Sequence, residues 1–429
     1  MLSINDEFYT QAEFSNQQAS YSKLPHINEH SCIAVCVEDT FTWLTLCLYF
    51  KQNHLSTMPI HANIPLATAR NMAEKAGCSL LIYRELTNFY ELSGNKLLDN
   101  SKQNTGIIQM SSGTTGEPKC ILRSWADIDI EIKSYCQTFK DANDMTPVIA
   151  CPITHSYGLI CGVMVALARK QTPKIISSIN PKYLIKVLKS CHQPLLYSSP
   201  VLLQGLLRLW PAGDKLFAAM TSGSTMSAQV FQQISPKVEK LYQQYGCSEA
   251  GCISLSQDLQ AANDLGQPLP HVAIDCGDGQ QQAREIIVKI NTTTGIKSIA
   301  TQDLGYFDSN QNLRFLARLD DTIIVSGLNV YPTEVEDIIL QHPKVSDVVI
   351  FKIEDAFAGF RICLQYVASE EISPADLRQW CSQQMATFQI PQVLQPVSEI
   401  ARMANSKVNR KQIAQKYHAD ISVNSALTA

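Results

Sequence analysis

The residues Ser111-Ser-Gly-Thr-Thr-Gly-Glu-Pro-Lys119 are the segment that decides how the rest of the sequence is interpreted. The apolar run Gly106–Met110 comes directly before it and is typical of a strand. The two glycines allow a tight turn that exposes backbone N–H groups, and the hydroxyls and the lysine add further donors for an anion. A Walker A loop would end in Gly-Lys-Ser/Thr, whereas Glu-Pro separates Gly116 from Lys119 here. The segment therefore predicts a phosphate-binding loop of another kind, and a hydroxyl-rich surface loop is the alternative.

Before this loop, short apolar runs that are typical of strands alternate with helical patterns. The runs Cys32–Val37, Ser56–Ile60 and Ser79–Tyr83 are predicted to be strands. Helices are predicted over Phe41–Lys51 and after Pro65, where apolar residues recur on one helical face. Because strands and helices alternate, this region predicts a parallel sheet that is covered by helices.

The C-terminal part of the sequence is organised differently. A helix is predicted to begin just after Pro332, with Thr333 and Glu336 as a capping box. Two strand-like runs follow, at Val345–Ile353 and Arg361–Ala368. A second helix is predicted to begin at Ser373-Pro374, because serine caps a helix well and proline suits its first turn.

These patterns predict an α/β protein with two domains. Residues 1–320 are expected to form a large domain of several subdomains with parallel, helix-covered sheets. Residues 321–429 are expected to form a small α+β domain, and the boundary is placed at Asp320.

Composition excludes several classes of protein. The chain has 429 residues, of which 45% are hydrophobic and 17% charged, as in globular proteins and unlike fibrous or disordered ones. The net charge of −4 gives no reason to expect nucleic acid as a partner. No apolar run reaches the roughly 20 residues of a membrane-spanning helix. The 14 cysteines are scattered and the first residues are polar, so reduced thiols and a cytoplasmic location are expected.

Five further segments accompany the loop, in a fixed order along the chain. They are Tyr245-Gly-Cys-Ser-Glu249, Asp303-Leu-Gly-Tyr-Phe307, Arg318-Leu-Asp-Asp321, Gly327-Leu-Asn-Val-Tyr-Pro-Thr-Glu-Val-Glu336 and Asn405-Ser-Lys-Val-Asn-Arg410. Together with the loop, they resemble the motifs of the adenylate-forming superfamily, which contains acyl- and aryl-CoA synthetases, nonribosomal peptide adenylation domains and luciferases. The region before the loop is shorter than is usual in that superfamily.

The resemblance implies an ATP site on the large domain, with Mg²⁺ as cofactor. Its ATP- or AMP-binding residues would be Ser111, Ser112, Gly113, Thr114, Thr115, Gly116, Ser224, Tyr245, Gly246, Ser248, Asp303 and Arg318. Among these, Tyr245 would lie against the adenine, and Asp303 would accept hydrogen bonds from the ribose. Lys119 would assist catalysis near the phosphates, and Glu249 would hold Mg²⁺, a hard ion that prefers oxygen ligands. Without the neighbouring motifs, Asp303 and Glu249 would each be interpreted as an ordinary surface carboxylate.

The resemblance also implies that the small domain moves during the reaction. Lys407 would be the catalytic cation that bridges the substrate carboxylate and the α-phosphate, and a solvated lysine is the alternative. Asp320 would be the hinge. After rotation of the small domain, Gly327 and Asn329 would line the channel for the incoming thiol.

The acid pocket is expected around Pro152-Ile-Thr-His155-Ser-Tyr-Gly158, which resembles a segment common in acyl- and aryl-acid ligases. His155 and Gly158 would line the pocket, and a core histidine is the alternative for His155. Thr221 and Gly223 would form one wall. Amino-acid-activating domains place an aspartate shortly before this region, and Asp141 and Asp144 are weak candidates because they lie in a polar, loop-like stretch.

The sequence therefore predicts an ATP-dependent ligase that activates a small aryl or acyl acid as acyl-AMP and transfers it to the phosphopantetheine thiol of CoA or an acyl carrier protein. An amino-acid-activating enzyme that loads a peptidyl carrier protein is one alternative, and a catalytically degenerate nucleotide-binding module is another. Gln302 stands before Asp303 where the superfamily has glycine, so the backbone there is expected to differ.

Overall fold

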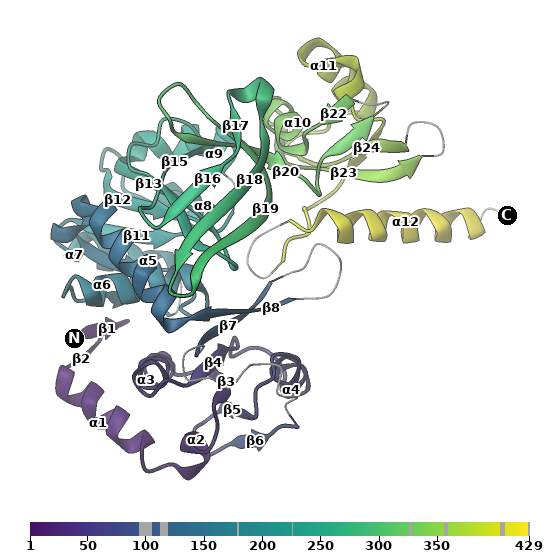
Figure 1. The fold of residues 1–429 in the computed structure, drawn as a ribbon. Helices are drawn as coiled ribbons and strands as arrows, with labels where there is room; N and C mark the ends of the chain where they lie inside the picture. The colour runs from purple at the N-terminus through teal and green to yellow at the C-terminus, as the bar shows by residue number, and fades with distance from the viewer. Residues whose placement is uncertain are drawn as a thin grey trace.

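The computed structural model describes residues 1–93, 105–111, 119–177, 180–224, 226–325, 328–355, 359–403 and 408–427. Its strands form three sheets, of six, fourteen and five strands, in that order from the bottom of Figure 1 to its upper right. No helix among the described residues is both long enough and apolar enough to cross a membrane.

The first sheet has the strand order β6-β5-β3-β4-β7-β8. Its strands are β3 (Cys32–Val37), β4 (Ser56–Pro59), β5 (Leu80–Arg84), β6 (Phe89–Glu91), β7 (Gly106–Ser111) and β8 (Lys119–Ser124). The neighbours β4 and β5 are both parallel to β3, as predicted. Helices α3 (Thr40–Gln52) and α4 (Leu66–Lys75) belong to two different core clusters and cover opposite faces of this sheet. The predicted parallel, helix-covered sheet is therefore confirmed.

The second sheet runs through the centre of the molecule. Its parallel part contains β1 (Leu2–Ile4), β10 (Lys174–Ile175), β9 (Thr146–Ile149), β11 (Pro194–Ser198), β12 (Leu216–Thr221) and β13 (Val238–Cys247), and β2 (Glu7–Tyr9) pairs antiparallel with β1 at its edge. Its antiparallel extension contains β14 (Gly251–Ser256), β15 (Asp264–Pro268), β16 (Val272–Asp275), β18 (Arg284–Thr292), β19 (Gly295–Phe307) and β20 (Leu313–Arg318). The two-residue strand β17 (Gly277–Asp278) pairs with β19. This extension was not predicted from the sequence.

Helices cover both faces of the parallel part. One face packs against α7 (Pro181–Ser190), α8 (Pro200–Arg208) and α9 (Ala228–Ile234), which share a core cluster with residues of β9, β11 and β12. The other face packs against α5 (Trp125–Thr138) and a π-helical segment, Tyr157–Met164, that continues into α6 (Val165–Ala168). Helix α1 (Gln11–Tyr21) packs against α3, and α2 (Pro25–Asn28) follows it at the bottom of Figure 1. The core cluster around α5 also includes α3, so the first two sheets share one continuous core.

The third sheet belongs to the C-terminal part of the chain. It contains β21 (Ile323–Val325), β22 (Leu328–Val330), β23 (Val345–Asp355), β24 (Gly359–Ala368) and β25 (Val393–Pro396). Helices α10 (Pro332–Ile339) and α11 (Pro374–Gln384) share its main core cluster, and α12 (Arg410–Leu427) packs on β23. As predicted, Ser373 caps α11 by accepting a hydrogen bond from the Asp376 N–H.

The predicted capping box of α10 is wrong. The N-cap residue is Tyr331, and no side chain caps the helix there. Instead, the Glu336 carboxylate accepts a 2.7 Å hydrogen bond from the Ile350 N–H and pairs with Arg410 at 2.8 Å. The Glu336 carboxylate, which the local pattern assigned to the helix cap, therefore binds Arg410 and the Ile350 N–H instead.

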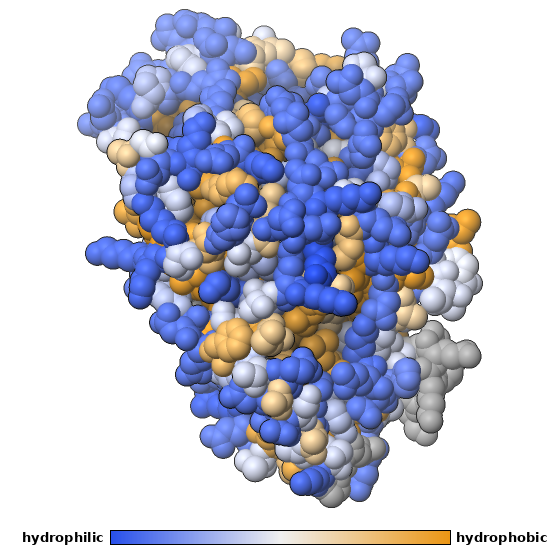
Figure 2. Space-filling model, turned by 90° about the vertical axis from the view of Figure 1, so that its left-hand side faces the viewer, coloured by the Kyte–Doolittle hydropathy of each residue, from blue (hydrophilic) through white to orange (hydrophobic). Residues whose placement is uncertain are grey.

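The predicted fold class is confirmed: a large α/β domain is followed by a small α+β domain. On the face in Figure 2, hydrophilic residues predominate and hydrophobic ones are interspersed among them.

Candidate active site

The predicted phosphate-binding loop joins β7 to β8. These strands are antiparallel, and Ser111 stands opposite Lys119, so the hairpin brings the two ends of the loop together. Lys119 is exposed at the start of β8. The loop residues Ser112, Gly113, Thr114, Thr115 and Gly116 lie outside the described residues, and their roles stay predictions.

The second predicted segment forms the end of β13 and the turn into β14. Tyr245 and Gly246 belong to β13, and Ser248 and Glu249 lie in the turn with half-buried side chains. A Cβ atom on Gly246 would lie 2.2 Å from the Gly251 carbonyl oxygen, so this close approach of the two strands requires glycine.

Tyr245, Asp303 and Arg318 come together although they are far apart in the sequence. The Tyr245 hydroxyl donates a 2.6 Å hydrogen bond to Oδ2 of Asp303. The Arg318 guanidinium donates to Oδ1 of the same carboxylate at 2.9 Å. Asp303 and Arg318 are also direct partners in the register of β19 and β20. The structure therefore places three of the predicted ATP-binding residues in one hydrogen-bonded group.

Burial and neighbouring charges set the protonation of this group. Burial raises the pKa of the Asp303 carboxyl, although Arg318 and the Tyr245 hydroxyl act to lower it. Burial and the adjacent carboxylate raise the pKa of Tyr245 well above its ordinary value. Tyr245 is thus a neutral donor at physiological pH, and each carboxylate oxygen of Asp303 retains lone pairs that can accept further hydrogen bonds.

The backbone before Asp303 is strained. Gln302 has a φ of 63°, which is the left-handed region that side chains other than glycine rarely adopt. Its backbone N–H and its side-chain amide both donate to Oε1 of Glu285, at 2.9 and 3.0 Å. These two hydrogen bonds hold Gln302 in this conformation.

The predicted acid-pocket segment lies beside the phosphate-loop hairpin. The Ser156 hydroxyl donates to the Gln109 side chain of β7. The next residue, Tyr157, donates a 2.6 Å hydrogen bond to the Met220 carbonyl oxygen in β12. Gly158 is buried, and a Cβ there would lie 2.6 Å from the Pro152 carbonyl oxygen. His155 is exposed within this segment, so the core-histidine alternative is wrong.

The predicted pocket wall follows Met220. Thr221 is fully buried, and its hydroxyl donates a 3.1 Å hydrogen bond to the Tyr242 carbonyl oxygen. Gly223 is exposed with a φ of 91°, and Ser224 is half-buried. The wall thus begins at the carboxyl end of β12, an edge where ligands bind in many parallel sheets.

The predicted hinge lies in a cluster of charged residues. Asp320 accepts a hydrogen bond from Arg318 at 3.3 Å, and its carbonyl oxygen accepts one from Lys352 at 2.9 Å. Arg410 lies 3.5 Å from the Asp321 carboxylate and pairs with Glu336. Of the residues assigned to the small domain, Asn329 is exposed in β22, whereas Gly327 and Lys407 lie outside the described residues.

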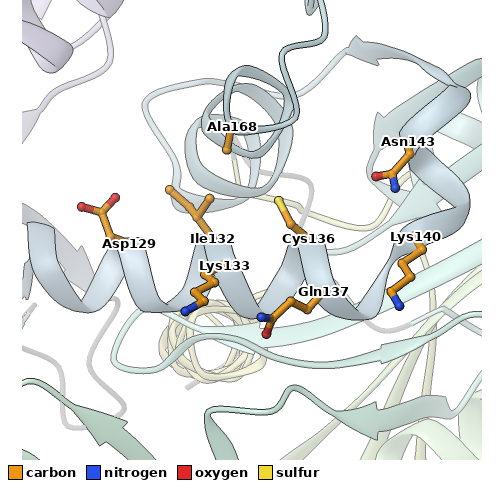
Figure 3. Close-up of a pocket in the computed structure, with 8 residues that line it drawn as sticks. All are labelled: Asp129, Ile132, Lys133, Cys136, Gln137, Lys140, Asn143 and Ala168. Atoms are coloured by element: carbon orange, nitrogen blue, oxygen red, sulfur yellow. The ribbon is translucent and has the colours of Figure 1, made fainter.

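The described residues offer little for two other kinds of site. Among the described residues, no group of three or more His, Cys, Asp or Glu side chains could hold a metal ion by itself. A shallow surface groove runs along α5, where Ile132 and Cys136 point toward Ala168 and Lys133 projects from the other side of the helix (Figure 3). None of the predicted site residues lines it.

Comparison with known proteins identifies the family. Residues 95–285 match the family model described as AMP-binding enzyme, and residues 334–407 match the one described as AMP-binding enzyme C-terminal domain. The chain belongs to the adenylate-forming AMP-binding enzymes. Like them, it is an ATP-dependent, AMP-forming ligase that activates a carboxylic acid and joins it to a thiol.

One curated relative matches almost the whole chain. It is the 3,4-dihydroxybenzoate–[aryl-carrier protein] ligase of Bacillus anthracis, with 35% identity over 96% of this chain and 98% of the relative. Among solved structures, ATP-bound MatB from Rhodopseudomonas palustris has a TM-score of 0.83 at 17% identity, covering 97% of this chain and 95% of that one. MenE from Bacillus subtilis, solved with ATP and magnesium, has a TM-score of 0.80 at 18% identity, with coverages of 96% and 95%.

The sequence analysis missed a buried ion pair behind the predicted site. Arg123 of β8 pairs with Glu131 of α5, and both side chains are almost fully buried. A signal was present, because Glu131 lies on the same helical face as the apolar residues Ile128 and Tyr135. A carboxylate in the middle of an apolar face requires a partner, which the pattern of one helix does not reveal.

Proposed function

We propose that this ligase activates an aromatic carboxylic acid, of the dihydroxybenzoate class, and transfers it to the phosphopantetheine thiol of an aryl carrier protein. The observation that supports the proposal is the 35% identity to the aryl-carrier protein ligase, which extends over 98% of that relative. The match thus includes the shortened region before the phosphate loop.

The described site has the chemistry that the first half-reaction needs. A carboxylate that attacks the α-phosphate of ATP brings one anion to another, so the site must supply positive charge and oriented donors. Lys119 supplies a cation at the loop, and the group formed by Tyr245, Asp303 and Arg318 offers donors and acceptors for a nucleoside. We propose that Lys407 adds the second cation when the small domain closes.

Glu249 suits Mg²⁺ as part of a site that ATP completes. Magnesium is commonly held by one or two carboxylates together with substrate phosphates, and it keeps several waters. A single half-buried carboxylate in the turn after Tyr245 fits that pattern, and no cage of several protein ligands is needed. When bound, the ion would neutralise charge that develops on the leaving pyrophosphate.

The amino-acid alternative loses its candidate residues. An ammonium group in a pocket needs a partner carboxylate that is buried there. The side chain of Asp141 is 60% exposed and lies 3.7 Å from Lys240 on the surface. Asp144 is also exposed. Neither aspartate therefore supplies the buried charge that an amino-acid substrate would require.

A two-step assay tests this proposal. The enzyme with MgATP is offered benzoate, 2,3- and 3,4-dihydroxybenzoate, phenylalanine and hexanoate, and acid-dependent pyrophosphate exchange into ATP is measured. The acids that support exchange are then combined with either CoA or a phosphopantetheinylated aryl carrier protein, and thioesters are detected by intact mass. The carrier without its phosphopantetheine is the control.

We expect exchange with a dihydroxybenzoate and a mass increase on the modified carrier alone. Exchange with phenylalanine only would replace this proposal with the amino-acid alternative. Thioester formation on CoA but not on the carrier would show that the thiol acceptor is CoA and not the proposed aryl carrier protein.

A further inference from the structure

The buried pair of Arg123 and Glu131 joins elements that carry two parts of the proposed ATP site. Arg123 lies on β8, which begins at Lys119 and follows the phosphate loop. Glu131 lies on α5 and does not line the surface groove along that helix. The exposed fractions of the two side chains are 7% and 1%, so the charges are removed from water.

This pair packs directly behind the turn that carries Glu249. The second oxygen of Glu131 accepts a 2.8 Å hydrogen bond from the Cys252 N–H at the start of β14. Gly251, with a φ of 75°, lies so close that a Cβ atom on it would be 2.5 Å from both Nη1 of Arg123 and Oε2 of Glu131. The backbone that leaves the turn is therefore held by Glu131 and has no room to move toward the ion pair.

Further contacts extend the network to the neighbouring elements. Gln244 of β13 accepts a 3.0 Å hydrogen bond from the Tyr135 hydroxyl on α5, and its amide donates to the Cys161 sulfur at 3.4 Å. Gln244 directly precedes Tyr245 in the chain. Both sides of the turn, β13 and β14, are thus fixed to α5.

Stability alone does not explain this arrangement. A buried ion pair often contributes no more than well-packed apolar residues would, because desolvation of the charges offsets their attraction. Here Nη1 of Arg123 is buried and has no hydrogen-bond partner among the described residues, which adds a further cost. The compensating gain is geometric, because the pair connects β8, α5 and the β13–β14 turn at one point.

We propose that Arg123 and Glu131 are positioning residues, which fix the Tyr245–Glu249 turn relative to the phosphate-loop hairpin so that triphosphate and Mg²⁺ are bound in register. Neither residue touches the substrate. Catalytic groups must be held within about half an ångström of their productive geometry, and a buried pair supports that precision. The inference rests on the roles proposed above for Tyr245 and Glu249.

The test uses a neutral pair, Arg123→Met with Glu131→Gln in the full-length chain. The glutamine oxygen can still accept from Cys252, and no unpaired charge remains in the core, so this variant keeps the fold better than either single change. Acid-dependent pyrophosphate exchange measures the KM for MgATP and kcat, and transfer from preformed acyl-adenylate is measured separately. Thermal unfolding reports stability.

Arg314→Met is the matched control. Arg314 pairs with the buried Asp264 at 3.3 Å and with Asp308 at 2.7 Å, and neither of these ion pairs involves the turn. We expect the control to lower the melting temperature without changing the KM for MgATP. The neutral pair is expected to raise that KM or lower kcat of exchange at least tenfold, and to affect transfer several-fold less. The single variant Arg123→Lys keeps a positive charge opposite Glu131 but lacks the guanidinium group. Its exchange activity is expected to lie between that of the neutral pair and that of the natural protein.

Two outcomes would overturn the inference. A neutral pair with normal exchange kinetics and a lower melting temperature would show a purely structural role, and so would an equal kinetic loss in the Arg314 control. Glu249→Gln tests the underlying assignment separately. If that single variant exchanges pyrophosphate normally at limiting Mg²⁺, the role proposed for the turn is wrong, whatever the ion pair does.

Discussion

At the scale of single residues, Asp303 organises the described part of the site. It is 5% exposed, and it receives one hydrogen bond from a neutral hydroxyl and one from a guanidinium. Such charge-assisted hydrogen bonds contribute about 1.5–3 kcal/mol each. The same carboxylate is proposed to accept hydrogen bonds from the ribose, so its charge supports both the shape of the site and the binding of nucleotide.

Asp303→Asn is expected to raise the KM for ATP by about 10- to 100-fold, because one charge-assisted interaction is lost and about 1.4 kcal/mol corresponds to a factor of ten. Pyrophosphate exchange at varied ATP concentration measures this change. Asp275→Asn is the control, since Asp275 forms an exposed pair with Arg284 at 3.2 Å, which contributes little. An unchanged KM in Asp303→Asn would contradict the ribose-binding role.

Gly158→Ala tests the acid pocket at the same scale. The added Cβ would meet the backbone carbonyl oxygens of Pro152 and Cys151 at 2.6 and 3.1 Å, so the segment Pro152–Gly158 must shift. We expect the KM for the acid to rise at least tenfold while the KM for ATP changes less. Gly205→Ala in α8 is the matched control, because nothing lies within 4 Å of its Cβ, and we expect it to stabilise the helix by about 0.5–1 kcal/mol. Equal effects of the two substitutions on the acid KM would contradict the pocket assignment.

At the scale of elements, the sequence predicted those whose signals are local. The strand Cys32–Val37 has the predicted bounds, and the helix that begins after Ser373 is capped as predicted. In the antiparallel extension, most strand pairs join near neighbours in the chain, such as Thr292 and Gly295, and the sequence analysis did not predict them. The pairing of β15 with β20 joins residues far apart in the sequence, Asp264 and Arg314, which no local pattern reports. The capping box of α10 failed for a similar reason, since Arg410 takes the carboxylate of Glu336 from the other end of the domain.

In the candidate site, too, some contacts were predicted from the sequence and others were not. The predicted neighbourhood of Tyr245, Asp303 and Arg318 came from resemblance, and the structure brings them within hydrogen-bonding distance. Arg123 and Glu131 belong to no recognised motif, and their pairing depends on how α5 packs against β8 and β14. A pattern along the chain reports which face of a helix is buried, but it does not report which residue lies opposite.

Glu336 predicts a dependence of stability on pH. Burial raises the pKa of its carboxyl from 4.5 to about 7, although Arg410 and the Ile350 N–H act to lower it. Because the folded pKa is the higher one, the stability from this group is fully present below pH 4.5 and is lost as pH rises through 7. Glu336→Gln has no such titration. The free energy of unfolding of the natural protein minus that of the variant is therefore expected to fall by on the order of 3 kcal/mol across this range.

Urea unfolding of both proteins at pH 5, 6, 7 and 8 measures this difference. Asp347→Asn, which alters a partly exposed pair with Arg402 at 2.8 Å, is the control and is expected to show a smaller pH dependence. If the curves for the natural protein and for Glu336→Gln ran parallel over the whole range, the raised pKa would be refuted.

At the scale of the whole molecule, α9 and α10 make polar contacts between the two domains. Asp337 of α10 accepts a 3.3 Å hydrogen bond from the Ala228 N–H at the start of α9. The Gln229 side chain donates to the Leu340 carbonyl oxygen, also at 3.3 Å. A hydrogen bond to a neutral partner contributes about 1 kcal/mol and one to a charged group about 1.5–3 kcal/mol, so these two contacts add modestly to the stability of the interface. Domain rotation about Asp320, which the resemblance implies, is compatible with such an interface.

The last prediction concerns the two half-reactions, adenylation and thiol transfer, which are proposed to use different arrangements of the two domains. Lys407 precedes Arg410, which begins α12 and is held by Asp321 and Glu336. If Lys407 is the cation that the small domain delivers to the α-phosphate, Lys407→Ala removes charge from the transition state of adenylation only. We expect pyrophosphate exchange to fall by about 10²-fold or more, in line with the loss of one group that stabilises developing charge.

Transfer of the acyl group from preformed acyl-adenylate to the thiol is expected to stay within about threefold in the same variant, because the rotated small domain presents another surface during that step. Lys416→Ala, an exposed residue of α12, is the control and should leave both half-reactions unchanged. Rapid-quench measurement of each half-reaction separates the outcomes. An equal loss in both half-reactions would contradict a role for Lys407 in adenylation alone. The two half-reactions would then not require different domain arrangements.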